Sequence, residues 1–446
     1  MKINIPNNAK KVLDTIHEAG FEAYVVGGCV RDSILGRNPE DWDITTSARP
    51  EQVKKLFKRT IDTGIAHGTV TVMIDKEGFE VTTYRIDGEY LDGRHPENVI
   101  YTGSLKEDLE RRDFTINAMA YNDEEGLVDE FDGLGDIKRK LIRCVGNAEK
   151  RFDEDALRIM RAIRFSAQLG YDIDEDTKSA IENKSKDLEK ISAERIQTEL
   201  VKLLLSDHPE KIEDAYKMGI TKVILPEFDK CMITEQNNPH HKYTVGYHII
   251  ETLKNIRSDR VLRITMLFHD IAKPEKKVTD SSGLDHFKGH PELGSQMTKK
   301  IMKRLKFDRN TMDRVCNLIL YHDYRFDATP KNVRKAIYKV GEADFPYLIE
   351  VKRADTCGQS DFGKEEKFAW IDEIEKVYHQ ILEDKNCLSL KQLAVNGKDL
   401  MEEGIEPGQR IGEILKRMLM DVLEYPEHNT KTFLIENISK FEGKEF

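Results

Sequence analysis

The chain has 446 residues, with 70 basic and 81 acidic side chains and a formal net charge of −11. At roughly 150 residues per domain this length predicts about three domains, and a hydrophobic content of 39% with only 13 prolines excludes collagen-like and wholly disordered chains. Because a uniformly acidic surface repels nucleic acid, any binding site for a polyanion must be a local cluster of basic side chains.

The cysteines and the apolar segments predict where the protein works. The six cysteines are scattered and include no C-x-x-C pair, which fits a reducing cytoplasm and excludes a cysteine zinc module. No apolar run reaches about 18 residues, the length that suggests a transmembrane helix, and the first residues lack an apolar signal core. We therefore expect a cytoplasmic protein that does not span or bind a membrane.

The first 145 residues alternate helical and strand patterns, which is typical of a small mixed β/α domain. Two segments that alternate apolar and polar residues flank K-E-G at 76–78 and predict a β-hairpin. The predicted elements are a helix within 1–20, a strand over 21–28, a helix over 29–36, a strand over 41–46, a helix over 48–57, and hairpin strands over 68–75 and 79–86.

From about residue 150 the pattern is helical almost throughout. The segment 153–170 has helical periodicity and ends at Gly170, and the segment 192–206 opens with Ser192. We therefore predict an α+β fold. Its expected divisions are a mixed β/α domain over 1–145, helical domains over 146–235 and 236–360, and a helical tail over 361–446.

Two short motifs in the first domain point to phosphate and metal chemistry. A glycine pair at 27–28 lies between a strand and a helix, where backbone N–H groups approach a phosphate closely, and Arg31 follows it. Asp41 and Asp43 form a D-x-D on the predicted second strand, where a period of two places both carboxylates on one face. A divalent cation such as Mg²⁺ is the natural partner of this pair, with Glu80 as a third candidate carboxylate.

These motifs belong to a longer ordered set, in which the next member contains Arg112, Asp113 and Asn117. The set resembles the class II tRNA nucleotidyltransferases, the family of the bacterial CCA-adding enzymes and the related poly(A) polymerases. The resemblance implies that the chain adds C, C and A to the 3′ end of tRNA from CTP and ATP without a nucleic-acid template, and that pyrophosphate leaves. The motifs that carry it are G-G-C-V-R-D (27–32), D-W-D (41–43), R-R-D-F-T-I-N-A-M-A (111–120), D-G-L-G-D-I (132–137) and E-D-A-L-R-I-M-R-A-I-R-F (154–165).

The resemblance assigns roles to individual residues. It makes Asp41 and Asp43 the catalytic ligands of Mg²⁺. Asp155 and Arg158, expected three residues apart on one helical face, would pair with the hydrogen-bonding edges that C and A share; the alternative is an exposed i,i+3 ion pair. The nucleotide-binding residues implied by the family are Gly28, Arg31, Arg112, Asp155, Arg158, Arg161 and Arg164.

Two further segments bear on the type of enzyme. The stretch 84–110 is intact, and in the family a shortened loop here accompanies enzymes that add only CC, so complete CCA addition or terminal A addition is favoured. A-adding and poly(A)-adding enzymes therefore remain alternatives. E-R-I-Q-T-E at 194–199 resembles a helix-stabilising motif of the family, and we expect it to form a structural ion-pair network.

The second half of the chain contains histidines at helical positions. With a histidine–aspartate pair inside an apolar run, the set resembles the HD metal-dependent phosphohydrolases, in which imidazoles and carboxylates bind a divalent transition metal or Mg²⁺. A phosphoester such as a 2′,3′-cyclic phosphate or a nucleotide would be the substrate, although some relatives retain such a domain without known activity. The alternative is a set of core histidines. The candidate ligands are His248, His269, Asp270 and Asp355, with His290 and His322 for a second metal.

Contacts to tRNA are expected from two further segments. The tail segment 395–412 resembles C-terminal tails of the nucleotidyltransferase family, which would bind the tRNA elbow. A basic cluster within 298–309 is either a contact to the tRNA backbone or a solvated helix face. Its members are Lys299, Lys300, Lys303, Arg304, Lys306 and Arg309.

Overall fold

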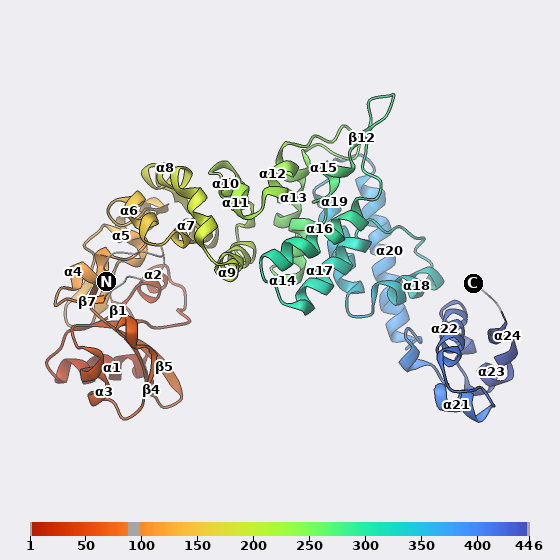
Figure 1. Ribbon diagram of the computed structural model, residues 1–446, viewed down its shortest axis with the longest axis horizontal. Coiled ribbons are helices and arrows are strands. Elements are labelled where there is room, and N and C mark those ends of the chain that lie inside the picture. The colour runs from red at the N-terminus through yellow and green to blue at the C-terminus, as the bar shows by residue number, and fades with distance from the viewer. Residues whose placement is uncertain (1, 88–98, 444–446) are drawn as a thin grey trace. The chain divides into compact units, whose positions relative to one another are not determined.

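The computed structural model describes residues 2–87 and 99–443, and the described chain forms two compact units, Met1–Pro226 and Glu227–Phe446 (Figure 1). Unit 1 contains a mixed β-sheet followed by helices, and unit 2 is helical apart from one short hairpin. The predicted α+β fold is therefore confirmed, whereas the predicted domain boundaries stay a prediction.

Unit 1 is built on a seven-stranded sheet in the order β3-β4-β5-β2-β1-β8-β9. β2 and β5 are parallel, and the other neighbouring strands are antiparallel. The central strands are short and fully buried, as expected for strands covered on both faces. The strands are β1 (Ala23–Val26), β2 (Ile44–Thr46), β3 (Thr60–Gly64), β4 (Thr69–Ile74), β5 (Glu77–Thr83), β8 (Ala120–Asn122) and β9 (Gly126–Val128).

The amphipathic N-terminal helix covers this sheet. α1 (Asn7–Glu18) buries Val12, Leu13 and Ile16 on one face and contacts β1, β4 and α3 (Pro50–Leu56). Its charged residues lie on the other face, so the pattern of the first 20 residues is explained by burial of a single apolar stripe.

The predicted strands are found with one important difference. The hairpin is β4 and β5, and its turn includes Asp75 at a φ of 54°. The strand expected over 41–46, however, covers only Ile44–Thr46, so Asp41 and Asp43 lie in the segment before it. Val26 N–H donates to the carbonyl of Asp43 at 3.0 Å, which is the last contact of this edge with β1. The expectation that both carboxylates lie on one face of a strand is therefore wrong.

The helical part of unit 1 also corrects one boundary. The helix predicted over 153–170 ends at Gly170 as expected, but α7 (Leu157–Leu169) begins only at Leu157. Asp155 is extended, with φ −147° and ψ 103°, and its carboxylate accepts the N–H of Leu157, the first residue of α7, at 2.9 Å. The remaining helices of unit 1 are α2 (Gly28–Ile34), α4 (Leu105–Glu110), α5 (Gly133–Arg139), α6 (Ala148–Glu154), α8 (Glu175–Lys184), α9 (Ala193–Leu204), α10 (Ile212–Lys217) and α11 (Ile220–Ile224).

Unit 2 is a set of packed helices around a buried apolar core. Leu262, Phe268, Val315 and Phe345 are fully buried there. The short hairpin of β12 (Val278–Thr279) and β13 (Asp285–His286) follows α15 (Lys273–Lys276). The other helices are α12 (Pro226–Ile233, which begins in unit 1), α13 (Val245–Lys254), α14 (Arg260–Phe268), α16 (His290–Arg304), α17 (Arg309–Tyr321), α18 (Pro330–Val340), α19 (Phe345–Cys357), α20 (Lys364–Glu383), α21 (Gly397–Glu402), α22 (Gln409–Glu424), α23 (Lys431–Glu436) and α24 (Ile438–Glu442).

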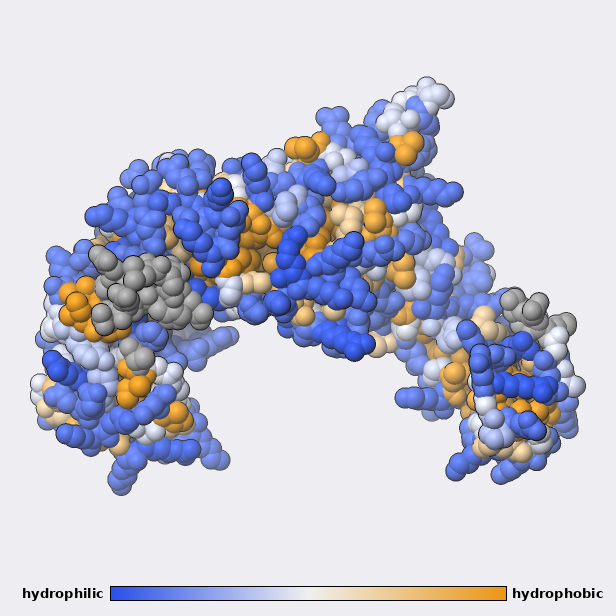
Figure 2. All heavy atoms as spheres, in the orientation of Figure 1, coloured by the Kyte–Doolittle hydropathy of each residue, from blue (hydrophilic) through white to orange (hydrophobic). Residues whose placement is uncertain are grey.

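The surface of both units is mainly hydrophilic. Figure 2 shows hydrophilic residues over most of the visible face, with hydrophobic side chains in smaller patches. Among the described residues, no helix is long and apolar enough to cross a membrane.

The end of α7 offers a test of backbone geometry. Gly170 has a φ of 68°, and a Cβ added there would lie 2.7 Å from Nε2 of His208. Gly36, at a φ of 70°, has no atom within 4 Å of its added Cβ. Left-handed backbone costs a non-glycine residue about 1–2 kcal/mol. We expect Gly170→Ala to lower the free energy of unfolding by more than Gly36→Ala in urea titrations followed by circular dichroism; equal losses would contradict the clash with His208.

Candidate functional site

Four of the five sequence motifs of unit 1 contribute to a cleft of about 1090 Å³, and the motif at 132–137 does not line it. The loop after β1, the segment before β2, and the helices α7 and α9 all contribute to its walls. Asp41 and Asp43 line it together with Gly27 and Gly28. Six basic side chains line the same cleft: Arg31, Arg37, Arg112, Arg161, Arg164 and Lys202.

Backbone contacts explain why the glycine pair and the aspartates come together. The end of β1 is held from both sides, since Val26 N–H donates to Asp43 O and Gly27 N–H donates to Met119 O at 3.1 Å. Gly27 has a φ of 80°, and a Cβ there would lie 3.0 Å from a guanidinium nitrogen of Arg112. Any larger residue would therefore push Arg112 away from the turn.

Within the described part of the chain, neither Asp41 nor Asp43 forms an ion pair, although the charge of Arg112 acts on Asp43. Loss of solvent raises the pKa of Asp43, Arg112 opposes this effect, and the negative charges of Glu80 and Asp41 add to it. Carboxylates that repel one another in this way favour binding of a divalent cation, and their oxygen atoms are the ligands that Mg²⁺ prefers.

The basic wall of the cleft is held by a buried carboxylate. Asp113 accepts two hydrogen bonds from Arg161, at 2.7 and 2.5 Å, and one from Asn117 at 3.1 Å. Asn117 in turn accepts from Arg31 at 2.6 Å. Burial alone would raise the pKa of Asp113, but Arg161 and Asn117 hold it well below its usual value.

Three guanidinium groups gather around one aromatic ring. Arg164, Arg31 and Arg161 lie 4.0, 5.0 and 5.3 Å from the centre of the Phe165 ring. Phe165 is buried and lines the cleft, so it fixes the positions of these cations through cation–π contact. Sequence reasoning did not single out Phe165, although its place in the arginine-rich helix was a usable signal.

The segment 194–199 forms ion pairs as expected. Arg195 contacts Asp155 at 2.7 Å, and Glu199 contacts Arg164 at 2.8 Å. The first pair joins α9 to the residues just before α7, and the second joins α9 to the middle of α7. These contacts agree with the predicted structural ion-pair network.

Asp155 and Arg158 are placed differently from expectation. Because Asp155 lies before α7, the two side chains do not share one helical face, and the expected geometry is wrong. Arg158 pairs with Glu154 and donates to the carbonyls of Arg151 and Arg111, both at 3.0 Å. Of the described nucleotide-site candidates, these two do not line the cleft, whereas Gly28, Arg31, Arg112, Arg161 and Arg164 do.

The intact loop within 84–110 is described only in part. β6 (Arg85–Asp87) pairs with β7 (Val99–Tyr101), and residues 88–98 lie outside the described residues. The argument from the length of this loop therefore stays a prediction.

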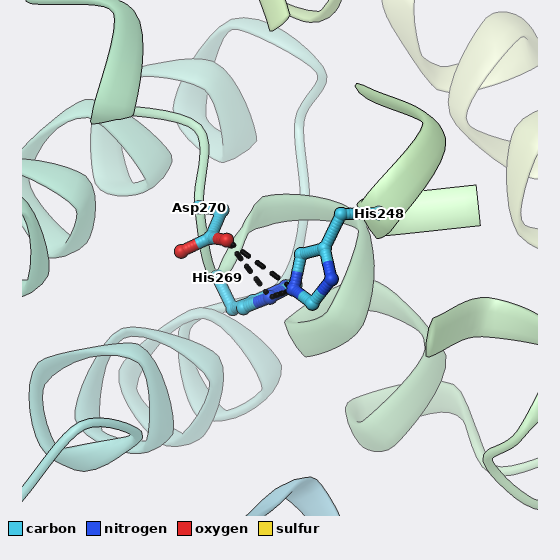
Figure 3. Close-up of side chains that lie close together, drawn as sticks. All are labelled: His248, His269 and Asp270. Carbon is cyan, nitrogen blue, oxygen red and sulfur yellow. Dashed lines mark hydrogen bonds and ion pairs between the residues drawn. The ribbon is translucent and has the colours of Figure 1, made fainter. Parts of the chain in front are cut away.

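The predicted histidine set of unit 2 converges on one buried aspartate, Asp270. Figure 3 shows two of these histidines, His248 and His269, beside it. Nε2 of His248 and Nε2 of His269 each lie 3.4 Å from Oδ2 of Asp270. On the other side, Nε2 of His290 and of His322 lie 3.4 and 3.6 Å from Oδ1. Asp270 thus faces two pairs of imidazoles, one with each carboxylate oxygen, which is the arrangement of a bridging ligand.

Backbone carbonyls orient every one of these imidazoles. Each ring places Nδ1 within hydrogen-bonding distance of a carbonyl, so Nδ1 carries a proton and Nε2 points into the cluster. The carbonyls belong to Gly358 for His248 (3.1 Å), Met266 for His269 (2.8 Å), Phe287 for His290 (2.8 Å) and Ile319 for His322 (2.7 Å).

Asp355 completes the first pair of histidines. Its Oδ1 lies 2.9 Å from Nε2 of His248 and 3.7 Å from Nε2 of His269, and its Oδ2 accepts from Gln359 at 3.0 Å. All six candidate ligands are therefore brought together, and four imidazoles with two carboxylates suit a divalent transition metal or Mg²⁺.

Two supporting residues were missed by sequence reasoning. Lys273, buried in unit 2, contacts Oδ2 of Asp270 at 2.7 Å, and Gln359 orients Asp355. Lys273 stands three residues after Asp270 in the same apolar segment, and this i,i+3 spacing was an available signal. Nothing local in the sequence marks Gln359.

Comparison with known proteins identifies the family of the chain. Three families match: Poly A polymerase head domain over residues 23–143, Probable RNA and SrmB- binding site of polymerase A over 170–232, and tRNA nucleotidyltransferase domain 2 putative over 292–438. The chain is 37% identical over 446 residues to the CCA-adding enzyme of Ligilactobacillus salivarius, covering 98% of each. It is 53% identical over 201 residues to that of Lactiplantibacillus plantarum, covering 45% of this chain and 49% of the relative.

Solved structures show a similar arrangement. The CCA-adding enzyme of Bacillus stearothermophilus in complex with CTP matches with a TM-score of 0.71 and 28% identity, covering 97% of this chain and 96% of the other. The Thermotoga maritima CCA-adding enzyme complexed with tRNA has the same fold, with a TM-score of 0.59 and 21% identity over 99% of both chains.

The contacts of Asp270 with both histidine pairs predict how many metal ions unit 2 binds. We expect the full chain, equilibrated with Mn²⁺ or Co²⁺ and dialysed, to retain two ions in unit 2. Asp270→Asn should lower occupancy of both positions, whereas His290→Ala should lose one ion, because Asp270 contacts both pairs and His290 only one. Metal content measured by mass spectrometry would test this.

A matched control is His286→Ala, since His286 is an exposed histidine paired with Asp280 on the hairpin. It should leave metal content unchanged. Full occupancy in Asp270→Asn would contradict the bridging role of Asp270, and the absence of retained metal in the unsubstituted chain would show that the cluster is a set of core histidines.

Proposed function

Because the chain belongs to the family of CCA-adding enzymes, we propose that it adds C, C and A to the 3′ end of tRNA, using CTP and ATP and releasing pyrophosphate. The observation that carries the proposal is the pair of neighbouring carboxylates, Asp41 and Asp43, in a cleft lined by six basic side chains. A terminal-A-adding or poly(A)-adding enzyme is the alternative within the same chemistry. We also propose that the protein works in the cytoplasm, as tRNA is its substrate.

We propose catalytic roles for the residues of the cleft. Asp41 and Asp43 hold Mg²⁺, which when bound lowers the pKa of the tRNA 3′-hydroxyl and neutralises charge at the α-phosphate. Arg31 and Arg112 bind the phosphates or the ribose of the incoming nucleotide, near the turn of Gly28. The residues thus mainly position the reactants and stabilise charge, as in other phosphoryl-transfer sites.

We propose that Asp155 and Arg158 select the base. Asp155 accepts from the exocyclic amino group of C or A, and Arg158 donates to the adjacent ring nitrogen. Uracil and guanine present the reverse pattern and would leave both groups mispaired. For this role, Asp155 must release Arg195 and Arg158 must release Glu154, so that both side chains can contact the base. Arg161 and Arg164, further along α7, then contact base or phosphate from the basic wall.

We propose that tRNA is bound along the helical parts of the chain. The cluster within 298–309 supports this role, because its lysines are exposed on the C-terminal part of α16 and beyond. Arg304 and Arg309 in that cluster pair with Glu227 and Asp313. The tail segment 395–412 is the second proposed contact.

A second function is favoured by the cluster in unit 2. We propose that residues 236–360 form an HD metal-dependent phosphohydrolase domain that holds two divalent ions and cleaves a phosphoester. The supporting observation is that four oriented imidazoles surround both oxygens of Asp270. In this reading 1–145 is the nucleotidyltransferase head, 146–235 the templating neck and 361–446 the tRNA-binding tail.

A transfer assay tests the first proposal. We expect purified protein with Mg²⁺, CTP and ATP to extend a tRNA transcript that lacks its last three nucleotides by C, C and A. Asp41→Ala and Asp43→Ala should each lose at least about 100-fold in rate while retaining tRNA binding, since charge stabilisation of this kind contributes several kcal/mol. Products are sized on a sequencing gel, with Asp62→Ala, an exposed aspartate outside the cleft, as the control.

The products also separate the alternatives. Use of ATP alone on tRNA ending in CC would indicate an A-adding enzyme, and a long ladder of A would indicate poly(A) synthesis. Unimpaired transfer by both aspartate variants would exclude the proposed metal site.

A second assay tests base selection. We expect Asp155→Ala to lower the preference for CTP and ATP over UTP and GTP by about 10-fold, because a mispaired group costs about 1–3 kcal/mol. Arg195→Ala, which removes the present partner of Asp155, should retain the preference. The measurement is incorporation of single nucleotides; unchanged selectivity in Asp155→Ala, with normal tRNA affinity, would contradict the role.

A further inference from the structure

Two of the six basic side chains in the cleft of unit 1, Arg37 and Lys202, differ from the other four. Within the residues that the structure describes, these two exposed side chains line the cleft without an ion-pair partner. Their charges are therefore available to an anion that enters the cleft. The other four each form an ion pair with a carboxylate: Arg31 with Asp32 at 2.9 Å, Arg112 with Asp108 at 3.6 Å, Arg161 with Asp113 at 2.5 Å, and Arg164 with Glu199 at 2.8 Å.

Lys202 continues a stripe of α9 that faces α7. Arg195 of this stripe contacts Asp155, and Glu199, four residues further on, contacts Arg164. Lys202 follows Glu199 by three residues, so it lies on the same face of the helix, one turn further along. Beyond its two ion pairs with α7 and the residues before it, this face of α9 therefore ends in a lysine that lines the cleft.

Arg37 reaches the same end of the cleft from the segment after α2. Its guanidinium group donates to the carbonyl of Gln168 at 3.3 Å. Gln168 lies four residues after Arg164 on α7, and Lys202 lies three residues after the partner of Arg164 on α9. Both cations therefore lie where α7 and α9 end. Asp207, just after α9, also lines the cleft, and within the described part of the chain it pairs with neither cation.

The cleft has room for more than one reactant. Its volume of about 1090 Å³ exceeds the roughly 300–1,000 Å³ of a pocket for one small molecule. The proposed transfer brings together two substrates that carry phosphate, the nucleotide and the RNA strand. In an in-line displacement the attacking 3′-hydroxyl and the departing pyrophosphate lie on opposite sides of the α-phosphate. The strand and the triphosphate therefore need separate groups to hold their phosphates.

We propose that Arg37 and Lys202 bind the phosphodiester backbone of the RNA strand beside its reacting 3′ end. The inference rests on the proposed nucleotidyl transfer and adds two binding residues to its site. Arg31 and Arg112 are paired and lie beside the glycine pair, which suits a nucleotide that takes the same place at every addition. The strand ends in a different nucleotide after each addition. Because a phosphate contact carries no sequence information, the same two cations serve every step.

The order of residues along α7 supports this division. Asp155 and Arg158, proposed to contact the base, lie at the beginning of the helix, and Arg161 and Arg164 lie in its middle. Gln168, which holds Arg37, follows Arg158 by ten residues. At about 1.5 Å of rise per residue this spacing spans roughly 15 Å. The base, the phosphates of the nucleotide and the RNA strand are thus assigned to successive stretches of one helix.

Kinetics with each substrate varied in turn test the assignment. We expect Arg37→Ala and Lys202→Ala each to raise the KM for a tRNA transcript ending in CC by about fivefold, which corresponds to about 1 kcal/mol for an exposed charge contact. The kcat and the KM for ATP should stay unchanged. Because each lost phosphate contact releases fewer counterions, the slope of log KM for RNA against log salt concentration should fall by about 0.7. Lys202→Arg, which retains the charge, should behave as the unsubstituted chain.

Matched controls are Lys55→Ala and Arg59→Ala. Both residues are exposed basic residues of unit 1 that do not line the cleft, so neither KM should change. An unchanged KM for ATP in the cleft variants also shows that each variant is folded. A raised KM for ATP with an unchanged KM for RNA would place the two cations on the triphosphate and overturn the proposal. An equal loss in the control variants would overturn it as well.

Modified RNA identifies the phosphate that is bound. A synthetic RNA hairpin ending in CC is prepared with a neutral methylphosphonate at one of its last three linkages. At the linkage that the cations contact, this change should raise the KM for the unsubstituted chain. It should have no further effect on the Arg37→Ala/Lys202→Ala double variant, because the charges that it would have contacted are already removed. Additive losses at all three linkages would contradict the contact.

Binding measurements separate this inference from the proposed transfer. The affinity for the hairpin, labelled at its 5′ end and followed by fluorescence anisotropy, does not depend on catalysis. Failure of the unsubstituted chain to extend any RNA would contradict the proposed transfer. An unchanged affinity in both cleft variants would overturn only the role of Arg37 and Lys202, even where the chain adds nucleotides normally.

Discussion

The buried carboxylate of Asp113 joins the sheet of unit 1 to the helix on the other side of the cleft. A carboxylate removed from water must be paired, and loss of one partner of a buried pair typically costs about 3–5 kcal/mol. Asp113 meets this requirement with Arg161 of α7 and Asn117, which also holds Arg31. The position of the basic wall opposite Asp41 and Asp43 follows from this one contact.

Unit 2 meets the same requirement in another way. Asp270 is 1% exposed, yet the groups around it are imidazoles whose Nε2 atoms face inward and a single lysine. Since the backbone carbonyls hold each Nδ1, the rings cannot turn away to find other partners. In unit 1 the protein's own arginines neutralise the buried carboxylate, whereas in unit 2 one lysine and four imidazoles surround it.

Both units also use aromatic rings to position cations. In the cleft of unit 1, guanidinium groups gather on Phe165, on the basic wall of the cleft that Asp41 and Asp43 also line. In both units an aromatic ring fixes cations by direct contact, for Lys352 beside Trp370 as for Arg164 beside Phe165.

The sequence by itself determined the α+β fold, the hairpin, the family motifs and the six residues that meet in unit 2, because alternation, helical period and motif spacing are local properties of the chain. The tertiary structure alone decided that Asp41 and Asp43 precede their strand and that Asp155 pairs with Arg195 of α9, since these positions depend on contacts between elements far apart in sequence. It also decided that Phe326 meets Trp370, because only the packing of α20 on α18 and α19 brings these distant parts of the chain together.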